Sequence, residues 1–391
     1  MSTRALGPLL VLALGCQRER PKPVAEPASS ASARSTPAPT ATSVERDEQL
    51  EAGAEAGLGE APELSDIGPA GPATASERGV VMITRDDELV LSALPKTPKE
   101  SFEGISLDGG AFFPYGRGPA LAGDYAYWIS KGRLVARRSG GGLEVLAEDA
   151  RNGTRVATSQ IGQRTVVAYV ARPASAAGDG TAKLWVSDGE PLLLSPEGSA
   201  ASSVALVGSM ALMLEGRTGM TPVHARRIVE RGGRVALEED AVVWIGGSAQ
   251  PLSEVSAGMS PSREAWAFVA IERDATAFGL AQIRIGERPR MAAPVTWRAY
   301  PNGVDPAPAA TARACDETWI AYVRPAEARP GAPQELHLAA LGPDGLGAPR
   351  ILARSRAFAN VSLASAGGGL LAVYTADHRT WAARVRCAPK Q

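Results

Sequence analysis

The feature that most constrains this chain is a unit of short β-strands that recurs along it. The clearest copy runs from Thr318 to Leu352 and contains three apolar and β-branched runs, TWIAYVRP, ELHLAALG and APRIL. Segments rich in Pro, Gly and Asp separate these runs, as is typical of antiparallel strands joined by short connections. Similar units recur on both sides at intervals of about 40–55 residues, a period expected of repeats that stack on one another.

Residues at matching places distinguish a true repeat from a generally β-rich sequence. Trp185 and Trp244 lie near the end of a third strand, whereas Trp266 and Trp319 begin a second strand. Small residues recur in the first strands and are expected to line a crowded central channel; they are Ala157, Ala205, Ala257, Ala312 and Ala364. We therefore predict an all-β fold, a single β-propeller of about seven blades, with six as the alternative count. A two-sheet sandwich would not need one unit copied so many times.

The first segment, MSTRALGPLLVLALGC, has the pattern of an export signal. Arg4 supplies a positive charge, and the apolar run that follows is too short to cross a bilayer. Its last four residues, Ala13-Leu14-Gly15-Cys16, resemble the lipobox of bacterial lipoproteins. That resemblance implies cleavage before Cys16, a thioether-linked lipid on its sulfur and acylation of the new N-terminus. An ordinary secretory signal peptide is the alternative.

Three regions follow from this pattern: a signal peptide at residues 1–15, a disordered linker at 16–72 and the propeller at 73–391. The linker is rich in Pro, Ala, Ser and charged residues, and such segments bury too little apolar surface to offset the entropy of ordering. Gln17 follows the lipobox, and by analogy with lipoproteins of Gram-negative cells it favours the outer membrane over the inner membrane. The bilayer is thus an expected partner, reached through acylated Cys16.

One unit carries a closer resemblance. The segment SPSREAWAFVA, followed by FGLAQIRIG, lies between Ser260 and Gly286 and resembles the TolB-type, WD40-like propeller repeat. That repeat has the pattern SPDG followed by an apolar strand, and Ser262-Arg263 replace its Asp-Gly here. The resemblance supports the fold and transfers no function, because propellers host unrelated activities.

Cysteine and histidine positions bound the chemistry. Besides Cys16, the chain has Cys315 and Cys387, which we predict to form a disulfide because an exported protein meets an oxidising compartment. Two free thiols are the alternative. The three histidines have no metal-ligand spacing, so we expect no metal centre and no cofactor.

The formal net charge of −1 is unlike the basic balance of nucleic-acid-binding proteins. We predict a non-catalytic binding or scaffolding module of the cell envelope, with an envelope protein or a glycan as its partner. A propeller-type glycoside hydrolase or lyase is the alternative, and a component of an envelope-assembly complex is another. No catalytic residues are assigned.

Long irregular stretches mark the expected binding face, because repeat proteins collect insertions on that face. One stretch, Arg217–Asp240, is expected to join a second strand to a third, and Thr296–Pro306 is expected to link two blades. Aromatic and arginine side chains are enriched at interaction hot spots. The candidates are Trp297, Arg298, Tyr300, Arg226 and Arg227. The alternative for Trp297 is that it fills a junction between blades.

Overall fold

The computed structural model describes residues 63–69, 72–83, 89–92, 117–173, 180–195, 200–215, 222–239, 241–244, 250–274, 276–286, 289–298, 309–329, 331–377 and 379–388. All of them belong to the compact unit Ala52–Gln391. Every regular element in these ranges is a β-strand, and all paired strands run antiparallel. The all-β prediction is confirmed. The predicted signal peptide, Cys16 and most of the predicted linker lie outside the described residues.

The first three sheets follow one another in chain order. One consists of β2 (Ala73–Ser76), β3 (Gly79–Ile83) and β4 (Leu89–Ser92). The next has β5 (Ala120–Ala122), β6 (Tyr125–Ser130), β7 (Arg133–Arg138) and β8 (Leu143–Ala147). The third has β9 (Ala157–Ile161), β10 (Arg164–Ala171), β11 (Thr181–Val186) and β12 (Leu192–Leu193).

Two larger sheets come next. The first contains β13 (Ala201–Val207), β14 (Met210–Glu215), β15 (Val223–Arg231), β16 (Arg234–Leu237) and β17 (Ala241–Trp244). The second contains β18 (Gln250–Pro251), β19 (Ser256–Met259), β20 (Ala265–Asp274), β21 (Ala277–Ile285), β22 (Arg290–Met291) and β23 (Val295–Arg298).

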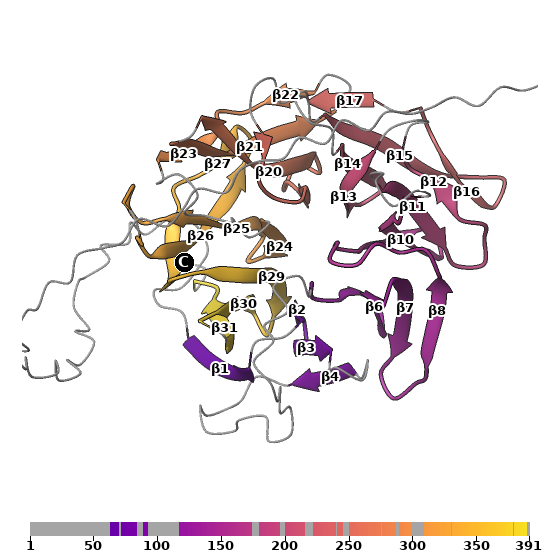
Figure 1. Cartoon of the computed structure of the whole chain (residues 1–391), viewed down its shortest axis with the longest axis horizontal. Helices are drawn as coiled ribbons and strands as arrows, with labels where there is room; N and C mark the ends of the chain where they lie inside the picture. The colour runs from indigo at the N-terminus through magenta and orange to yellow at the C-terminus, as the bar shows by residue number, and fades with distance from the viewer. Residues whose placement is uncertain are drawn as a thin grey trace, which may run out of the picture. The chain divides into compact units, whose positions relative to one another are not determined.

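Two more sheets complete the arrangement. One has β24 (Ala310–Ala314), β25 (Glu317–Pro325), β26 (Gln334–Gly342), β27 (Gly345–Leu346) and β28 (Arg350–Ser355). The last has β29 (Phe358–Ala366), β30 (Gly369–Ala376), β31 (Arg379–Arg386) and β1 (Glu63–Pro69). Figure 1 shows the sheets following one another around a common centre, with strands such as β2, β13, β24 and β29 nearest to it and β4, β8, β16 and β22 outside.

The sheets form a β-propeller, and six of them have four or more strands. The sheet β2–β4 has only three strands among the described residues. The structure therefore has six complete blades, which agrees with the alternative count, and the expected count of about seven is not supported. The counts differ because the first sequence unit is short and supplies no fourth, outer strand within the described ranges. That unit is PATASERGVVMITRDDELVLSALP.

The predicted boundary at residue 73 is too late. Strand β1 pairs with β31, so a segment assigned to the linker forms the outer strand of the last blade. Ile67 of β1 is almost fully buried, in a cluster with residues of β2, β3, β30 and β31. Asp66 pairs with Arg379, whose Nη2 lies 2.6 Å from the carboxylate. Sequence reasoning missed β1 because ELSDIGP has only two large aliphatic side chains, of which Ile67 is buried and Leu64 is 49% exposed.

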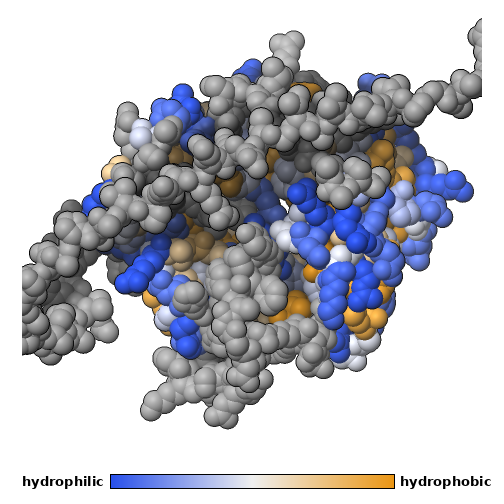
Figure 2. Space-filling view, in the orientation of Figure 1, coloured by the Kyte–Doolittle hydropathy of each residue, from blue (hydrophilic) through white to orange (hydrophobic). Residues whose placement is uncertain are grey.

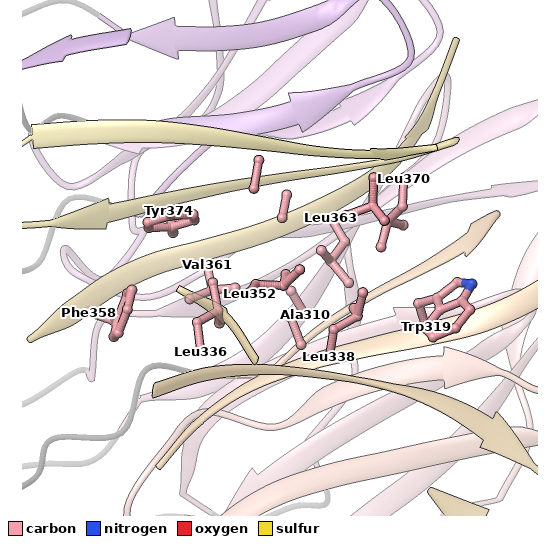
Figure 3. Packing of buried hydrophobic residues seen from close by; sticks show 14 of the residues in the cluster. Ala310, Trp319, Leu336, Leu338, Leu352, Phe358, Val361, Leu363, Leu370 and Tyr374 are labelled. Carbon is pink, nitrogen blue, oxygen red and sulfur yellow. The ribbon is translucent and has the colours of Figure 1, made fainter. Parts of the chain in front are cut away.

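The hydrophobic core consists of layers between neighbouring sheets. In one layer, Trp319, Leu336 and Leu338 from β25 and β26 face Leu370 and Tyr374 from β30 (Figure 3). Similar layers join β13–β17 with β19–β21 and β9–β12 with β13–β16. Hydrophilic residues cover much of the exposed surface over β6–β8 and β15–β16, on the right of Figure 2. Each sheet buries both faces between neighbours and exposes its outer edge, which explains why the middle strands read as continuous apolar runs in the sequence.

Candidate functional site

A cavity of about 210 Å³ lies at the centre of the propeller, lined by residues at or near the first strands of successive sheets. Figure 2 shows a hollow near the middle of the face turned to the viewer. Three of the predicted channel residues, Ala157, Ala205 and Ala257, line it. The other two, Ala312 and Ala364, are not among the residues that line this cavity, and both pack against hydrophobic layers between blades. Ala312 and Ala364 each come two residues later in β24 and β29 than Ala310 and Ser362, which do line the cavity.

Hydroxyl groups on the first strands link neighbouring sheets around this cavity. Ser256 donates to the carbonyl of Ala309, and Thr311 donates back to the carbonyl of Ala257. Thr74 and Ser362 share a hydrogen bond of 3.0 Å between their hydroxyl oxygens. These bonds satisfy polar groups that the close approach of the strands removes from water, so the inner strands hold one another in register.

Three charged side chains meet at the edge of the cavity. Arg155 immediately precedes Val156 and β9, Arg117 precedes β5, and Glu254 precedes β19. The Nε atom of Arg117 lies 3.3 Å from Glu254 Oε2, and the Nε atom of Arg155 lies 3.5 Å from the same oxygen. The backbone N–H of Arg155 donates to Glu254 Oε1 at 3.1 Å. One carboxylate is therefore shared by two guanidinium groups, and the formal charge of the cluster is +1.

Arg155 also reaches across the centre. Its Nη2 donates to the carbonyl of Val361 in β29 at 3.0 Å, and its Nη1 donates to the carbonyl of Ala309 at 3.4 Å. Burial lowers the pKa of Arg155 to about 10, and the attraction of Glu254 opposes that shift. At neutral pH the guanidinium remains charged. One side chain thus connects the blade of β9 to the blades of β19, β24 and β29.

Sequence reasoning missed this cluster, although a signal was present. Arg117, Arg155 and Glu254 each occupy the position two or three residues before the first strand of a unit. Aligned units would place these positions at one end of the channel, where charged residues of opposite sign attract one another. The prediction for the first strands concerned only their small residues.

A second polar cluster is buried between two blades. His337 of β26 is 2% exposed, and its Nε2 lies 2.9 Å from Glu335 Oε2 and 2.9 Å from Arg324 Nε. Arg354 donates to Glu335 Oε1 at 3.0 Å. Burial lowers the pKa of His337, and the positive charge of Arg324 adds to the shift. The Nε2 atom of His337 thus faces both a donor, the Nε–H of Arg324, and an acceptor, the carboxylate of Glu335, whereas Nδ1 has no hydrogen-bond partner among the described residues.

Trp297 is connected to this buried cluster through Tyr322. It is buried in the layer between β20–β23 and β25–β26, and its ring stacks on Tyr322 with 6.5 Å between centroids. Tyr322 in turn stacks on His337 at 5.5 Å. This position agrees with the alternative reading, in which Trp297 fills a junction between blades. Tyr300 lies outside the described residues, and so does the side chain of Arg298, whose backbone ends β23.

The other two binding candidates lie on a strand. The expected irregular stretch Arg217–Asp240 contains β15 and β16, which form a hairpin, so that expectation was wrong. Its charged run RRIVERGGR concealed the strands because the outer part of the hairpin is exposed to solvent. Arg226 donates to the carbonyls of Leu193 and Glu238, which fixes its side chain. Arg227 is largely exposed, with its Nε 3.7 Å from Glu238 Oε2.

Cys315 and Cys387 form a disulfide with a Cα–Cα distance of 5.4 Å, as predicted. Cys315 lies in the turn between β24 and β25, where it and Asp316 both have positive φ, as a type I′ hairpin turn requires. Cys387 follows β31. The bond therefore joins the last two blades of the chain.

The described residues contain no group of three or more His, Cys, Asp or Glu side chains placed to hold a metal ion. None of their elements is a helix long and apolar enough to span a bilayer.

No protein-family model matches this chain, and no curated protein matches it significantly. The chain is similar to a solved structure of a protein of unknown function from Dyadobacter fermentans, at 11% identity and a TM-score of 0.44, over 83% of this chain and 98% of that one. It is also similar to the PQQ-bound aldose sugar dehydrogenase from Streptomyces coelicolor, at 14% identity and a TM-score of 0.42, over 69% and 93% of the two chains. A protein from Lactobacillus plantarum is 13% identical, with a TM-score of 0.38 over 81% and 92%. Likenesses this distant carry no argument, so the site is interpreted from its own geometry.

Proposed function

We propose that this protein is an exported, lipid-anchored β-propeller that acts as a non-catalytic binding module of the cell envelope. The lipid would be attached to Cys16, and the residues between Cys16 and β1 would separate the propeller from the membrane. At ~3 Å per residue for a Pro-rich segment, that separation could reach several nanometres.

The arrangement around Arg155 is the observation that supports a non-catalytic role. A catalytic acid or base at the channel must be able to exchange a proton with a substrate at a matched pKa. Glu254, the carboxylate at this end of the channel, instead pairs with two arginines and accepts the N–H of Arg155. Arg155 in turn holds backbone carbonyls of two blades. These contacts favour a rigid ring that presents its surface to a partner.

The anchor is tested by expressing the full chain and its Cys16→Ser variant in a Gram-negative host. The native chain is expected in the membrane fraction, with a lipid mass on the N-terminal peptide. The variant is expected in the soluble fraction without that mass. Retention of the unlipidated variant in the membrane fraction would contradict the proposal.

The binding role is tested with a photo-crosslinking residue placed at single exposed sites in intact cells. Arg227, one of the predicted binding residues, is a suitable site because about 60% of its side-chain surface is exposed. Leu143, exposed on the outer strand β8, is the matched control. A discrete crosslinked product from position 227 that position 143 does not give is the expected result. Equal products from both sites, or none, would argue against a partner at this site.

A further inference from the structure

We propose that the central cavity binds a small organic acid that carries a hydroxyl group beside its carboxylate. The carboxylate would pair with the Arg117–Arg155 cluster, and the hydroxyl would donate a hydrogen bond to Asn360. The inference goes beyond the proposed function, because it concerns a small ligand inside the propeller and does not depend on the lipid anchor or on a partner at the surface.

The first argument is charge. The two guanidinium groups of Arg117 and Arg155 share the single carboxylate of Glu254, which leaves a formal charge of +1 in a largely buried place. About a fifth of each arginine side chain is exposed. A buried charge without a counter-charge is unfavourable, so an anion beside the cluster would be stabilised.

The second argument is the number of donors. A guanidinium group has five N–H donors. In Arg155, Nη1 donates to the carbonyl of Ala309 and Nη2 to the carbonyl of Val361, while Nε lies 3.5 Å from Glu254 Oε2. The second N–H of each terminal nitrogen thus has no hydrogen-bond acceptor among the described residues, and Arg155 lines the cavity. A planar pair of free N–H groups is suited to a carboxylate.

The third argument is Asn360. This residue of β29 also lines the cavity, is 6% exposed, and has a buried Oδ1 atom without a hydrogen-bond partner among the described residues. It directly precedes Val361, whose carbonyl binds Arg155. An acceptor in this place calls for a ligand O–H or N–H group, because a buried polar atom left unpaired is costly. Asn360 also has a φ of 50°, in the left-handed region that Asn adopts more readily than most residues.

The cavity volume sets the size of the ligand. A site needs roughly 10–15 Å³ of this kind of volume for one water molecule. A cavity of about 210 Å³ therefore admits a molecule of several non-hydrogen atoms, such as a two- to four-carbon hydroxy acid. Ser256, Ser362 and Thr311 also line the cavity, but their hydroxyl groups already form hydrogen bonds between neighbouring blades.

The test is isothermal titration of the full chain in detergent solution at constant ionic strength. The probes are glycolate, which has a carboxylate and an adjacent hydroxyl, acetate, which has the carboxylate alone, and ethylene glycol, which has hydroxyls alone. Glycolate is expected to bind about three- to tenfold more tightly than acetate, the value of one additional net hydrogen bond. Ethylene glycol is expected to give no binding.

Three variants separate the parts of the site. Asn360→Gly keeps the positive φ and removes the acceptor, so it should bind acetate as before and lose the preference for glycolate. Asn360→Asp has nearly the same shape and adds a negative charge, so it should weaken both acids at least about tenfold. Arg117→Gln should do the same, because it brings the formal charge of the cluster to zero.

Arg138→Gln is the control. It removes one positive charge from an exposed side chain that pairs with Asp124 outside the cavity, and it should bind glycolate like the native chain. Thermal melting of each variant confirms that it is folded. Absence of glycolate binding by the folded native chain would overturn the proposal, and so would equal binding by native, Asn360→Asp and Arg117→Gln proteins. A negative result in this titration would not contradict the proposed lipid anchor or the proposed surface partner, because neither depends on the cavity.

Discussion

The Nη2 atom of Arg155 lies 3.0 Å from the carbonyl oxygen of Val361, although 206 positions separate the two residues. The contact joins the segment before β9 to the middle of β29, on different blades. Together with the contacts to Ala309 and Glu254, it makes one side chain the common neighbour of four blades. Long-range contacts of this kind cost loop entropy to form, so they stabilise the closed ring only when the blades are already assembled.

Trp297→Ala is predicted to destabilise the protein by about 3–5 kcal/mol, the usual cost of deleting a large buried aromatic side chain. Urea unfolding followed by circular dichroism measures the change. Met291→Ala is the control, because Met291 is exposed on β22 of the same sheet and should change stability by less than about 0.5 kcal/mol. A stable Trp297→Ala protein that loses only partner capture would restore Trp297 as a binding residue.

Removal of the disulfide by the paired change Cys315→Ser and Cys387→Ser is predicted to destabilise the protein by about 2–5 kcal/mol. The bond closes a sequence separation of 72 residues, so its loss increases the entropy of the unfolded chain. Alkylation with and without reductant provides the second readout. Both cysteines should resist alkylation in the native, unreduced protein, and ready labelling of either one would refute the bond.

Stability is predicted to fall as the pH drops below about 6.5, and His337 contributes to this fall. Burial lowers its pKa in the folded state, whereas the unfolded chain has the ordinary value near 6.5. Below that value the unfolded state binds a proton that the folded state does not, so acid favours unfolding, by at most about 1.4 kcal/mol per pH unit for one group. Above about pH 6.5 His337 is unprotonated in both states, so its contribution to the pH dependence of stability ends there.

Urea unfolding of the native chain and of His337→Gln between pH 8 and pH 5 measures this contribution. Gln keeps an acceptor near Arg324 and does not titrate. The native chain should therefore lose more stability than the variant over this range. Parallel pH profiles would show that His337 is not responsible.

The strand units and the disulfide could be predicted from the sequence, because they follow from local patterns. Apolar runs and turn residues mark strands wherever they occur, and the two cysteines had few alternative partners once export to an oxidising compartment was predicted. The blade count was less accessible, because an incomplete first unit resembles a complete one when only its apolar runs are considered. Strand β1 was missed for a related reason: its pairing with β31 uses backbone groups, which leave no pattern in ELSDIGP.

The central cluster was inaccessible for a different reason. A repeat period indicates which strands face the centre, but the reach of a long side chain across the ring depends on the geometry of the closed propeller. Arg155 looks like any isolated arginine in RVATSQ. Trp297 shows the converse: an aromatic residue in a sequence rich in turn formers resembles a surface hot spot, yet its side chain is buried against Tyr322.

Two substitutions on β1 test whether this strand closes the propeller. Ile67→Ala removes a buried side chain and is predicted to cost about 2–4 kcal/mol. Leu64→Ala, on the same strand, removes a side chain that is 49% exposed and should cost less than about 0.5 kcal/mol. If residues 63–69 were a free linker, both substitutions would be neutral in urea unfolding.

The central claim is that Arg155 and Glu254 act together to hold the middle of the propeller. A double-mutant cycle with Arg155→Met and Glu254→Gln, measured by urea unfolding, tests it most directly. Gln at position 254 can still accept the N–H of Arg155, so the cycle isolates the charged contact. We predict a coupling free energy of about 1–3 kcal/mol, the range found for residues in one buried network. Effects of the two changes that add to within about 0.5 kcal/mol would contradict the claim.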